Sequence, residues 1–381
     1  MTDKYSKEIR STVTSEGNVE LSITKVPVPT PTDDEVLIEV HAAPISPSDL
    51  ALLITFGGDL ANINISGSEE NTVASMKVHP AMMKSMKSRL DQAMPAGNEG
   101  AGIVIDAGSN VKHLTGKTVG LAGGAMYSQY ICVPAVNCLV MDDETTPAEA
   151  ASSFVNPMTA LSFVETMKIE NHSGILVIDN TAAASNLGQM LVKICNDDGI
   201  PLVNIVRTQE QVDLLKNIGA KYVCNTSEEN FKETLVTALI ETGATLGFDA
   251  TGGGNNGELP GQILAAMEIA SNSASGEYSR YGSETYKQVY IYGGLDPSPT
   301  ILKRSYGMSW GLGGWLLMPM LKKIGMEKLQ EMRVRVAKEI KTTFASGYGQ
   351  EISFEAILQP EIIQAYAQQK TGNKFLVNPQ M

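Results

Sequence analysis

Residues 175–195, ILVIDNTAAASNLGQMLVKIC, decide the fold class of this chain. The first four are apolar and suit a buried parallel strand. Leu187, Leu191 and Ile194, with Met190 beside them, then recur at helical spacing. Small residues fill the turn between the two segments. The stretch therefore predicts the strand, turn and helix of a doubly wound α/β sheet.

The turn in this stretch resembles a degenerate dinucleotide-binding loop. Small side chains let the backbone approach a pyrophosphate, and a helix N-terminus presents unpaired N–H groups to it. Only Gly188 remains of the glycine pattern, because Ser185 and Asn186 stand where a glycine-rich loop has glycines. The motif is short, so an ordinary strand-to-helix turn is an open alternative.

A basic residue follows the next apolar run. Residues 202–206 predict a second buried strand, and Arg207 lies 19 residues after Gly188 (207 − 188 = 19). At this spacing an acidic side chain favours NADH, whereas an arginine favours the 2′-phosphate of NADPH. A surface arginine at a strand end is the alternative. We therefore expect NADPH as the cofactor and NADH as the less favoured one.

Two more apolar runs, 246–254 and 289–294, end in glycines. In open α/β sheets ligands lie beyond the carboxyl ends of the strands, where glycine permits close backbone approach. The predicted cofactor-binding residues are Ala183, Ser185, Asn186, Leu187, Gly188, Arg207, Gly252, Tyr292, Gly293 and Gly294.

Length and composition restrict the class of protein. At 381 residues the chain exceeds the usual size of one domain, so we expect two. The net charge of −13 argues against a nucleic-acid or membrane surface and favours small-molecule partners. The four cysteines form no CxxC motif, which disfavours disulfides and a zinc knuckle. No apolar targeting segment is evident, so we expect a cytoplasmic protein.

The domain organisation follows from a change in periodicity. Val36, Ile38 and Val40 recur at the two-residue period of a strand, and the early chain is β-rich. Residues 146–149, Thr-Pro-Ala-Glu, form a capping box that predicts a helix reaching about residue 167. The expected domains are a β-rich domain at 1–146, completed by 313–381, and a doubly wound dinucleotide-binding domain at 147–312.

Four further segments carry a family resemblance. They are AAPISPSDL at 42–50, GNEG at 97–100, VNPMTA at 155–160 and YGG at 292–294. With the loop at 180–188, they make the chain similar to the medium-chain dehydrogenase/reductase superfamily, specifically its zinc-free quinone reductase and mitochondrial-type 2-enoyl thioester reductase branches. The resemblance implies a GroES-like β-rich catalytic domain, a Rossmann domain, hydride transfer from a nicotinamide, and a homodimer.

The same resemblance implies roles for particular residues. Asn156 and Thr159 lie where relatives approach the nicotinamide. Zinc alcohol dehydrogenases have a cysteine and a histidine where this chain has Ile45-Ser46 and Asn98, so no metal is expected. Enoyl thioester reductases have a tyrosine that assists the reaction near Phe56, which has no hydroxyl.

The proton donor is therefore open. Candidates are Tyr127, Thr55 or a water molecule, and Tyr127 is alternatively an aromatic residue packed in a wall of the cleft. Phe56 and Trp310 are expected in the substrate pocket, although the segment 310–315 equally fits a subunit interface.

Two insertions separate the chain from its relatives. In residues 59–95, Met82, Met86 and Leu90 share a helical face, which fits either a lid over the substrate or an amphipathic helix on the domain surface. The second insertion, 271–287, has the potential to reshape the mouth of the pocket.

Together these features predict a zinc-independent, NADPH-dependent oxidoreductase that transfers hydride to an activated C=C bond or a quinone-type, electron-poor acceptor. Ser185, Asn186 and Phe56 depart from the family pattern. They motivate one alternative, a catalytically inactive nucleotide-binding regulatory protein. A second is a 2-enoyl thioester reductase with a non-standard proton donor, and a third is an alcohol dehydrogenase with unrecognised metal ligands.

Overall fold

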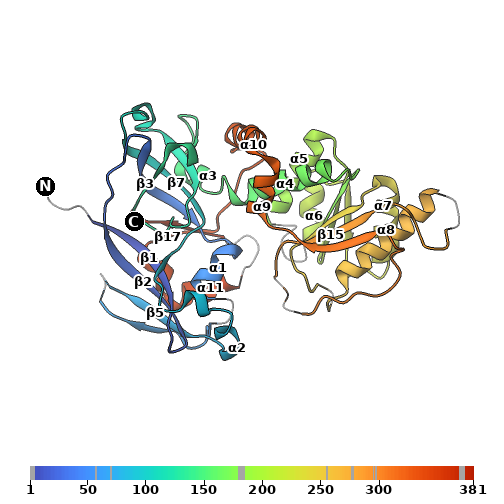
Figure 1. Cartoon of the computed structure of the whole chain (residues 1–381), viewed down its shortest axis with the longest axis horizontal. Coiled ribbons are helices and arrows are strands. Elements are labelled where there is room, and N and C mark those ends of the chain that lie inside the picture. The colour runs from blue at the N-terminus through green and yellow to red at the C-terminus, as the bar shows by residue number, and fades with distance from the viewer. Residues whose placement is uncertain are drawn as a thin grey trace. The chain divides into compact units, whose positions relative to one another are not determined.

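The computed structural model describes residues 5–55, 58–68, 71–178, 185–254, 256–275, 279–294, 296, 298–368 and 374–381. The chain divides into two compact units (Figure 1). The first comprises Met1–Val155 and Arg335–Met381, and the second comprises Asn156–Val334.

The first unit is β-rich. Its strands are β1 (Tyr5–Val13), β2 (Asn18–Pro27), β3 (Glu35–Pro44), β4 (Asn64–Ser66), β5 (Val73–Lys77), β6 (Met94–Pro95), β7 (Glu99–Ala107), β8 (Thr118–Ala122), β9 (Tyr130–Pro134), β10 (Leu139–Val140), β17 (Gln350–Ser353) and β18 (Phe375–Asn378). One sheet has the order β4-β5-β2-β1-β6, and the other has the order β10-β8-β7-β3-β18-β17, with β9 paired to β3. Its α-helices are α1 (Leu50–Leu53), α2 (Pro80–Met83), α3 (Pro147–Ala150) and α11 (Pro360–Ala367), and its 3-10 helices are η1 (Pro47–Asp49), η2 (Lys87–Arg89), η3 (Lys112–Leu114), η4 (Ala135–Asn137) and η5 (Glu355–Leu358).

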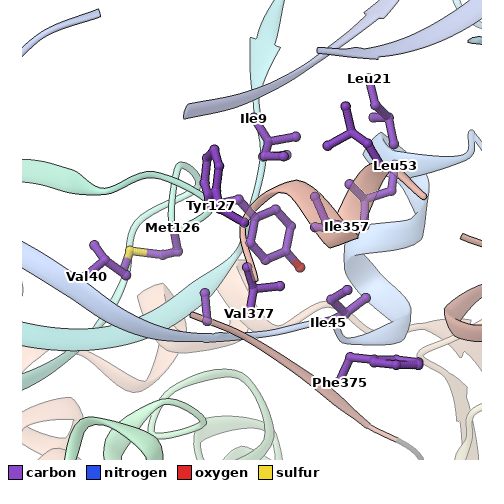
Figure 2. Packing of buried hydrophobic residues seen from close by; sticks show 14 of the residues in the cluster. Ile9, Leu21, Val40, Ile45, Leu53, Met126, Tyr127, Ile357, Phe375 and Val377 are labelled. Carbon is purple, nitrogen blue, oxygen red and sulfur yellow. The ribbon is translucent and has the colours of Figure 1, made fainter. Parts of the chain in front are cut away.

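The C-terminal segment completes the core of the first unit. Strand β18 pairs antiparallel with β3, and Val377 lies opposite Ala43. Figure 2 shows Val377 and Ile357 packed around Tyr127, far away in the sequence. Burial of these apolar side chains stabilises the packing of the C-terminal segment against the first unit.

The second unit is a doubly wound parallel sheet. Its elements are α4 (Val155–Ile169), β11 (Ile175–Ile178), α5 (Asn186–Asp198), β12 (Leu202–Val206), α6 (Gln209–Asn217), β13 (Tyr222–Asn225), α7 (Phe231–Thr242), β14 (Leu246–Asp249), α8 (Leu259–Ser275), β15 (Lys287–Ile291), β16 (Trp310–Gly314), α9 (Leu317–Ile324) and α10 (Met326–Lys338). The strand order β13-β12-β11-β14-β15-β16 reverses between β11 and β14, which is the topological switch point of a Rossmann sheet. The predicted fold class is confirmed.

The capping box at Thr146 and Glu149 is present, but the helix that it opens is shorter than expected. Helix α3 lasts one turn, and α4 begins afresh at Val155. The break is stabilised from β7, because Oε2 of Glu99 accepts the N–H groups of Phe154 (3.1 Å) and Val155 (2.8 Å). A buried carboxylate thus satisfies amides at a helix start, which have no intrahelical acceptor.

The second unit extends beyond the expected boundary at residue 312, because a strand lies across it. Strand β16 pairs parallel with β15 from Trp310 opposite Lys287 to Gly314 opposite Ile291, and α9 follows. The sequence of β16, WGLGG, is rich in glycine, which is depleted in strands. Its pairing partner, not its composition, makes it a strand.

A buried ion pair ties β15 to α8. Lys287 is fully buried, and its Nζ donates to Oε2 of Glu268 (2.6 Å), Oγ of Ser283 (2.9 Å) and the carbonyl of Thr285 (2.8 Å). Glu268 also accepts the N–H of Ser283 at 2.8 Å. The pair therefore fixes the segment that leads into β15.

We expect Glu268→Gln to lower the free energy of unfolding by about 3 kcal/mol, because it leaves a buried ammonium without its charge partner. The matched control is Glu258→Gln, which breaks a more exposed pair with Lys303 (2.7 Å). That control should lose less than about 1 kcal/mol. Urea denaturation of both variants measures the difference, and equal losses would contradict a stabilising role for the buried pair.

Candidate cofactor site and active site

The amino end of α5 lies at the carboxyl edge of the parallel sheet, directly after β11. Ser185 is its N-cap, and its Oγ accepts the N–H of Gly188 at 3.2 Å. The first amides of a helix lack intrahelical acceptors and carry the positive end of its dipole. Ser185, a departure from the glycine pattern, thus caps the helix, and the start of α5 is suited to an anion. The preceding turn, including Ala183, lies outside the described residues.

Arg207 follows β12, the strand beside β11. Its backbone N–H donates to Oε1 of Gln211 at 2.9 Å, and Gln211 forms the capping box of α6 with Thr208. Arg207 itself is exposed. The cap fixes the backbone and places a cation at the same edge of the sheet as the start of α5.

The carboxyl end of β14 contains a buried carboxylate that sequence reasoning missed. Asp249 is fully buried, and its Oδ1 accepts the N–H and the Oγ1–H of Thr251, both at 2.7 Å. Its Oδ2 has no hydrogen-bond partner in the described structure, and burial raises the pKa of the group. Gly252 follows with φ +75°, a conformation that favours glycine. The available signal was the Asp-x-Thr spacing of a side-chain turn.

A hollow of about 430 Å³ lies at the carboxyl ends of β15 and β16. A Cβ on Gly293 would approach the carbonyl oxygen of Ala250 to 2.3 Å, so this position requires glycine. A Cβ on Gly294 or Gly314 would meet nothing within 4 Å, so these glycines border open space. The hollow is lined by Ile291, Tyr292, Gly293, Gly314, Trp315, Leu316 and Pro319.

An aromatic cluster fixes the wall of this hollow. Phe163 of α4 stacks on Phe248 of β14 with centroids 3.8 Å apart. Tyr292 and Trp315 pack edge-on against Phe163 at 5.0 and 4.9 Å. Nε1 of Trp315 donates to Oγ1 of Thr166 at 3.1 Å. The buried rings and the hydrogen bond hold Tyr292 and Trp315 in place at the hollow.

The expected nicotinamide residues lie on the same helix as this cluster. Asn156 and Thr159 are in the first turns of α4, where Asn156 is half-buried and Thr159 is buried. Phe163 and Thr166 of the same helix contact Tyr292 and Trp315, which line the hollow. The roles of Asn156 and Thr159 stay predictions.

The structure describes one of the two expected substrate-pocket residues, Trp310. Trp310 begins β16, at the opposite end of the strand from Gly314, and packs edge-on against Tyr306 with centroids 5.2 Å apart. Trp315 lines the hollow, and Trp310 does not. Phe56 lies outside the described residues.

Tyr127 has a packing role in the first unit (Figure 2). Its side chain is fully buried, and its hydroxyl donates to the carbonyl oxygen of Pro44 at 3.1 Å. Burial is the main cause that raises the pKa of Tyr127 well above its ordinary value. Of the two roles expected for Tyr127, this environment favours a packed aromatic residue over a proton donor. Thr55 is also fully buried, at φ +56°, a strained backbone for a β-branched residue.

A buried carboxylate joins the segments of Ser46 and Asn98, where zinc ligands were expected to be missing. Asp49 accepts the N–H of Ser46 (2.8 Å) and the N–H of Asn98 (2.9 Å), and Nδ2 of Asn98 donates to Oγ of Ser48 (3.0 Å). Burial raises the pKa of Asp49 to about 7. In the described part of the chain, no three His, Cys, Asp or Glu side chains gather as they would around a metal ion.

The described helices include none with the length and apolarity that a membrane crossing requires. The insertion at 59–95 packs on the first unit: Met82, Met83 and Met86 contact its core, and Arg89 donates to the carbonyls of Ala51 (3.0 Å) and Leu52 (3.2 Å). Of the two alternatives for this insertion, these contacts favour an amphipathic segment on the domain surface over a lid.

Comparisons with known proteins agree with this architecture. No family model matches the chain. It is 28% identical over 232 residues to the mitochondrial enoyl-[acyl-carrier-protein] reductase of Xenopus tropicalis, covering 58% of this chain and 56% of that protein. It is 23% identical over 327 residues to an L-threonine 3-dehydrogenase of Sinorhizobium medicae, covering 78% and 92%. The match spans about half the length of the first of these enzymes and its animal relatives.

Solved structures share the fold over nearly the whole chain. A putative NADPH:quinone reductase from Mesorhizobium loti superposes with a TM-score of 0.68 at 21% identity, covering 100% of both chains. A mutant of Etr1p in complex with NADP and crotonyl-CoA superposes with a TM-score of 0.65 at 16% identity, covering 98% and 99%. This chain therefore shares the fold of these reductases. The predicted resemblance to the zinc-free quinone reductase and enoyl thioester reductase branches of the medium-chain dehydrogenase/reductase superfamily is confirmed.

The raised pKa of Asp49 predicts a pH-dependent stability. The folded pKa is about 7 and the unfolded value 3.8, so the folded state holds the proton more tightly. The contribution of Asp49 is therefore largest below the unfolded pKa and is lost as pH rises through the folded pKa. We expect the unfolding free energy of the native protein, minus that of Asp49→Asn, to fall between these values and to level off above them.

Urea denaturation across this pH range measures the difference. Asp106→Asn, at an exposed carboxylate on β7, is the control and should give a much flatter difference. A flat profile for Asp49→Asn would show that Asp49 ionises normally in the folded protein.

Proposed function

We propose that this protein is a zinc-independent, NADPH-dependent oxidoreductase that transfers hydride to an activated C=C bond or a quinone-type acceptor. The observation that carries the proposal is the hollow beyond β15 and β16, bordered by Gly293, Gly314 and Trp315. It lies at the carboxyl edge of a Rossmann sheet, where such sheets bind dinucleotides. Named relatives that are enoyl reductases and neighbours in complex with NADP support the same class of reaction.

The residues present fit a dinucleotide. The amino end of α5 suits the pyrophosphate because it offers unpaired amides and a positive dipole. Arg207 suits a 2′-phosphate because a guanidinium binds phosphate through charge-assisted hydrogen bonds. Gly314 leaves open space beside Trp315 in the hollow, where a flat ring is accommodated. When bound, the nicotinamide supplies the hydride.

The acceptor must be electron-poor at the carbon that receives the hydride. An activated C=C bond takes the hydride at one carbon and a proton at the other, whereas a quinone takes a hydride and a proton to give a hydroquinone. Hydroxyl or backbone donors polarise the acceptor oxygen without a charged acid. The enoyl reductases among the relatives favour the C=C acceptor, with a donor other than a tyrosine at the place of Phe56.

Arg207→Ala should separate NADPH from NADH. Hydrogen bonds to a charged group are worth roughly 1.5–3 kcal/mol, so we expect NADPH to bind on the order of 10- to 100-fold more weakly. The affinity for NADH should be unchanged, because it lacks the 2′-phosphate.

The readout is quenching of tryptophan fluorescence during titration with each cofactor. The chain has two tryptophans, so a Trp310→Phe background leaves Trp315 at the hollow as the reporter. Arg280→Ala, at an exposed arginine before β15, is the matched control. Equal weakening of both cofactors would argue against a 2′-phosphate contact, and binding of neither would favour loss of the cofactor site.

Gly314→Leu tests the hollow itself. A side chain there enters open space, so the fold should tolerate it while the ring of a bound cofactor is displaced. Overpacking costs about 1–3 kcal/mol, so we expect NADPH to bind at least about tenfold more weakly at an unchanged melting temperature. The control is Gly347→Leu, where a Cβ in the other unit also meets nothing within 4 Å. Unchanged NADPH binding by Gly314→Leu would place the cofactor elsewhere.

Catalysis is tested by NADPH absorbance in the presence of quinones, enals and enoyl thioesters. Steady consumption with one class identifies the acceptor, whereas tight binding without turnover favours the nucleotide-binding regulatory alternative. Zinc independence, a homodimer and a cytoplasmic location belong to the same proposal. Metal analysis and size-exclusion chromatography of the purified protein test the first two.

A further inference from the structure

A second hollow, of about 330 Å³, lies at the opposite edge of the same sheet. It is bordered by the residues that enter β14 and β15, and by the carboxyl ends of α4, α7 and α8. Its lining therefore belongs to the amino edge of the sheet, away from Gly293 and Trp315. Four of its residues, Ser271, Ala274, Thr285 and Tyr286, come from the insertion 271–287. That insertion thus shapes this second hollow.

One wall of this hollow contains a buried histidine with an unused nitrogen. His172 is 9% exposed, and its Nδ1 lies 2.8 Å from Oγ1 of Thr245, which also lines the hollow. Its Nε2 is buried and has no hydrogen-bond partner in the described structure. Burial is the main cause that lowers the pKa of His172, so the ring is neutral near pH 7. A buried polar atom without a partner is rare, which points to a ligand.

The electrostatic character of the hollow is negative. Among the described residues that line it, Glu170 is acidic and none is a lysine or an arginine. The Glu170 carboxylate accepts the hydroxyl of Tyr290 (3.1 Å to each oxygen) and contacts Nζ of Lys323 (3.3 Å), a half-exposed lysine that offsets part of the charge. The carboxyl ends of α4, α7 and α8 add the negative ends of three helix dipoles. A cation is stabilised at such a place, whereas an anion is repelled.

The rest of the lining is apolar or aromatic. Met267 and Ile240 supply aliphatic surface, and the ring of Tyr286 lies 6.3 Å from that of His172, centroid to centroid. An aromatic face attracts cations, and a thioether adapts to varied apolar shapes. The volume is near the lower end of small-molecule sites, about 300–1,000 Å³.

We propose that this hollow is a second ligand site, which binds a small organic cation made of a protonated amine on an apolar or aromatic body. The His172 ring turns slightly when the ligand binds, so that Nε2, which is buried in the free protein, accepts a hydrogen bond from the ammonium. Glu170 balances the charge, and the body packs against Tyr286 and Met267. In this arrangement Nδ1–H of His172 donates to Thr245. The site does not depend on the cofactor site, because the two lie at opposite edges of the sheet.

The first test is a titration of the full-length protein with benzylammonium, followed by NMR of the histidine rings. The chain has four histidines, and His172→Gln identifies the signal of His172. We expect that signal to shift on titration and its ring nitrogens to report a proton on Nδ1. A shift confined to other histidines, no shift at millimolar concentrations, or a proton on Nε2 would overturn the proposal.

The second test compares three probes of similar size by calorimetry: benzylammonium, benzyl alcohol and benzoate. Benzylammonium should bind at least about tenfold more tightly than the other two, because a charged hydrogen-bonded pair is worth roughly 1.5–3 kcal/mol. Glu170→Gln keeps the shape of the side chain and should reduce this preference to near unity. Glu233→Gln, in the first turn of α7, is the control and should leave it unchanged.

Circular dichroism checks that both variants are folded. If Glu170→Gln is unfolded, the three-probe comparison on the native protein still decides the charge preference. Equal binding of benzoate and benzylammonium, or an unchanged preference in a folded Glu170→Gln variant, would falsify the assignment of a cation site.

Discussion

The parallel pairing of all the strands from β13 to β16 is the constraint on which the rest of the second unit depends. Because the strands run in one direction, the helices that connect them begin at one edge of the sheet and end at the other. The carboxyl edge therefore gathers helix N-termini and positive dipole ends, and the amino edge gathers the negative ends. The two proposed sites follow this polarity, an anionic cofactor at one edge and a small cation at the other.

Packing rather than charge fixes the wall of the hollow at the carboxyl ends of β15 and β16. Phe163 stacks on Phe248, and Trp315 and Tyr292 pack edge-on against Phe163. Helix α4, strand β14 and the residues that follow β15 and β16 therefore share a single aromatic cluster. Buried rings in edge-to-face contact have few alternative arrangements. Through these rings, residues on α4 hold the glycines at the ends of β15 and β16 in a defined place.

Buried carboxylates organise the segments of the first unit around Ser46 and Asn98. Asp49 joins the backbone at Ser46 to that at Asn98, and Glu99 satisfies the first amides of α4. Each carboxylate is held by backbone N–H groups, which stabilise its charged form against the penalty of burial. In the sequence Ser46 and Asn98 only disfavour zinc, whereas in the structure a hydrogen-bond network joins their segments.

Local sequence by itself determined the doubly wound sheet, the exposed arginine after β12, and the glycines at strand ends, because periodicity and glycine content are properties of short segments. It did not determine which tryptophan lines the hollow: Trp310 and Trp315 are five residues apart, about 16 Å along an extended strand. Nor did it reveal the pairing of β16 with β15, or the burial of Asp249 and of His172 beside Thr245, because pairing and burial depend on residues far away in the chain. Tertiary structure decided these features, since pairing, burial and the meeting of helix ends arise only when distant segments pack together.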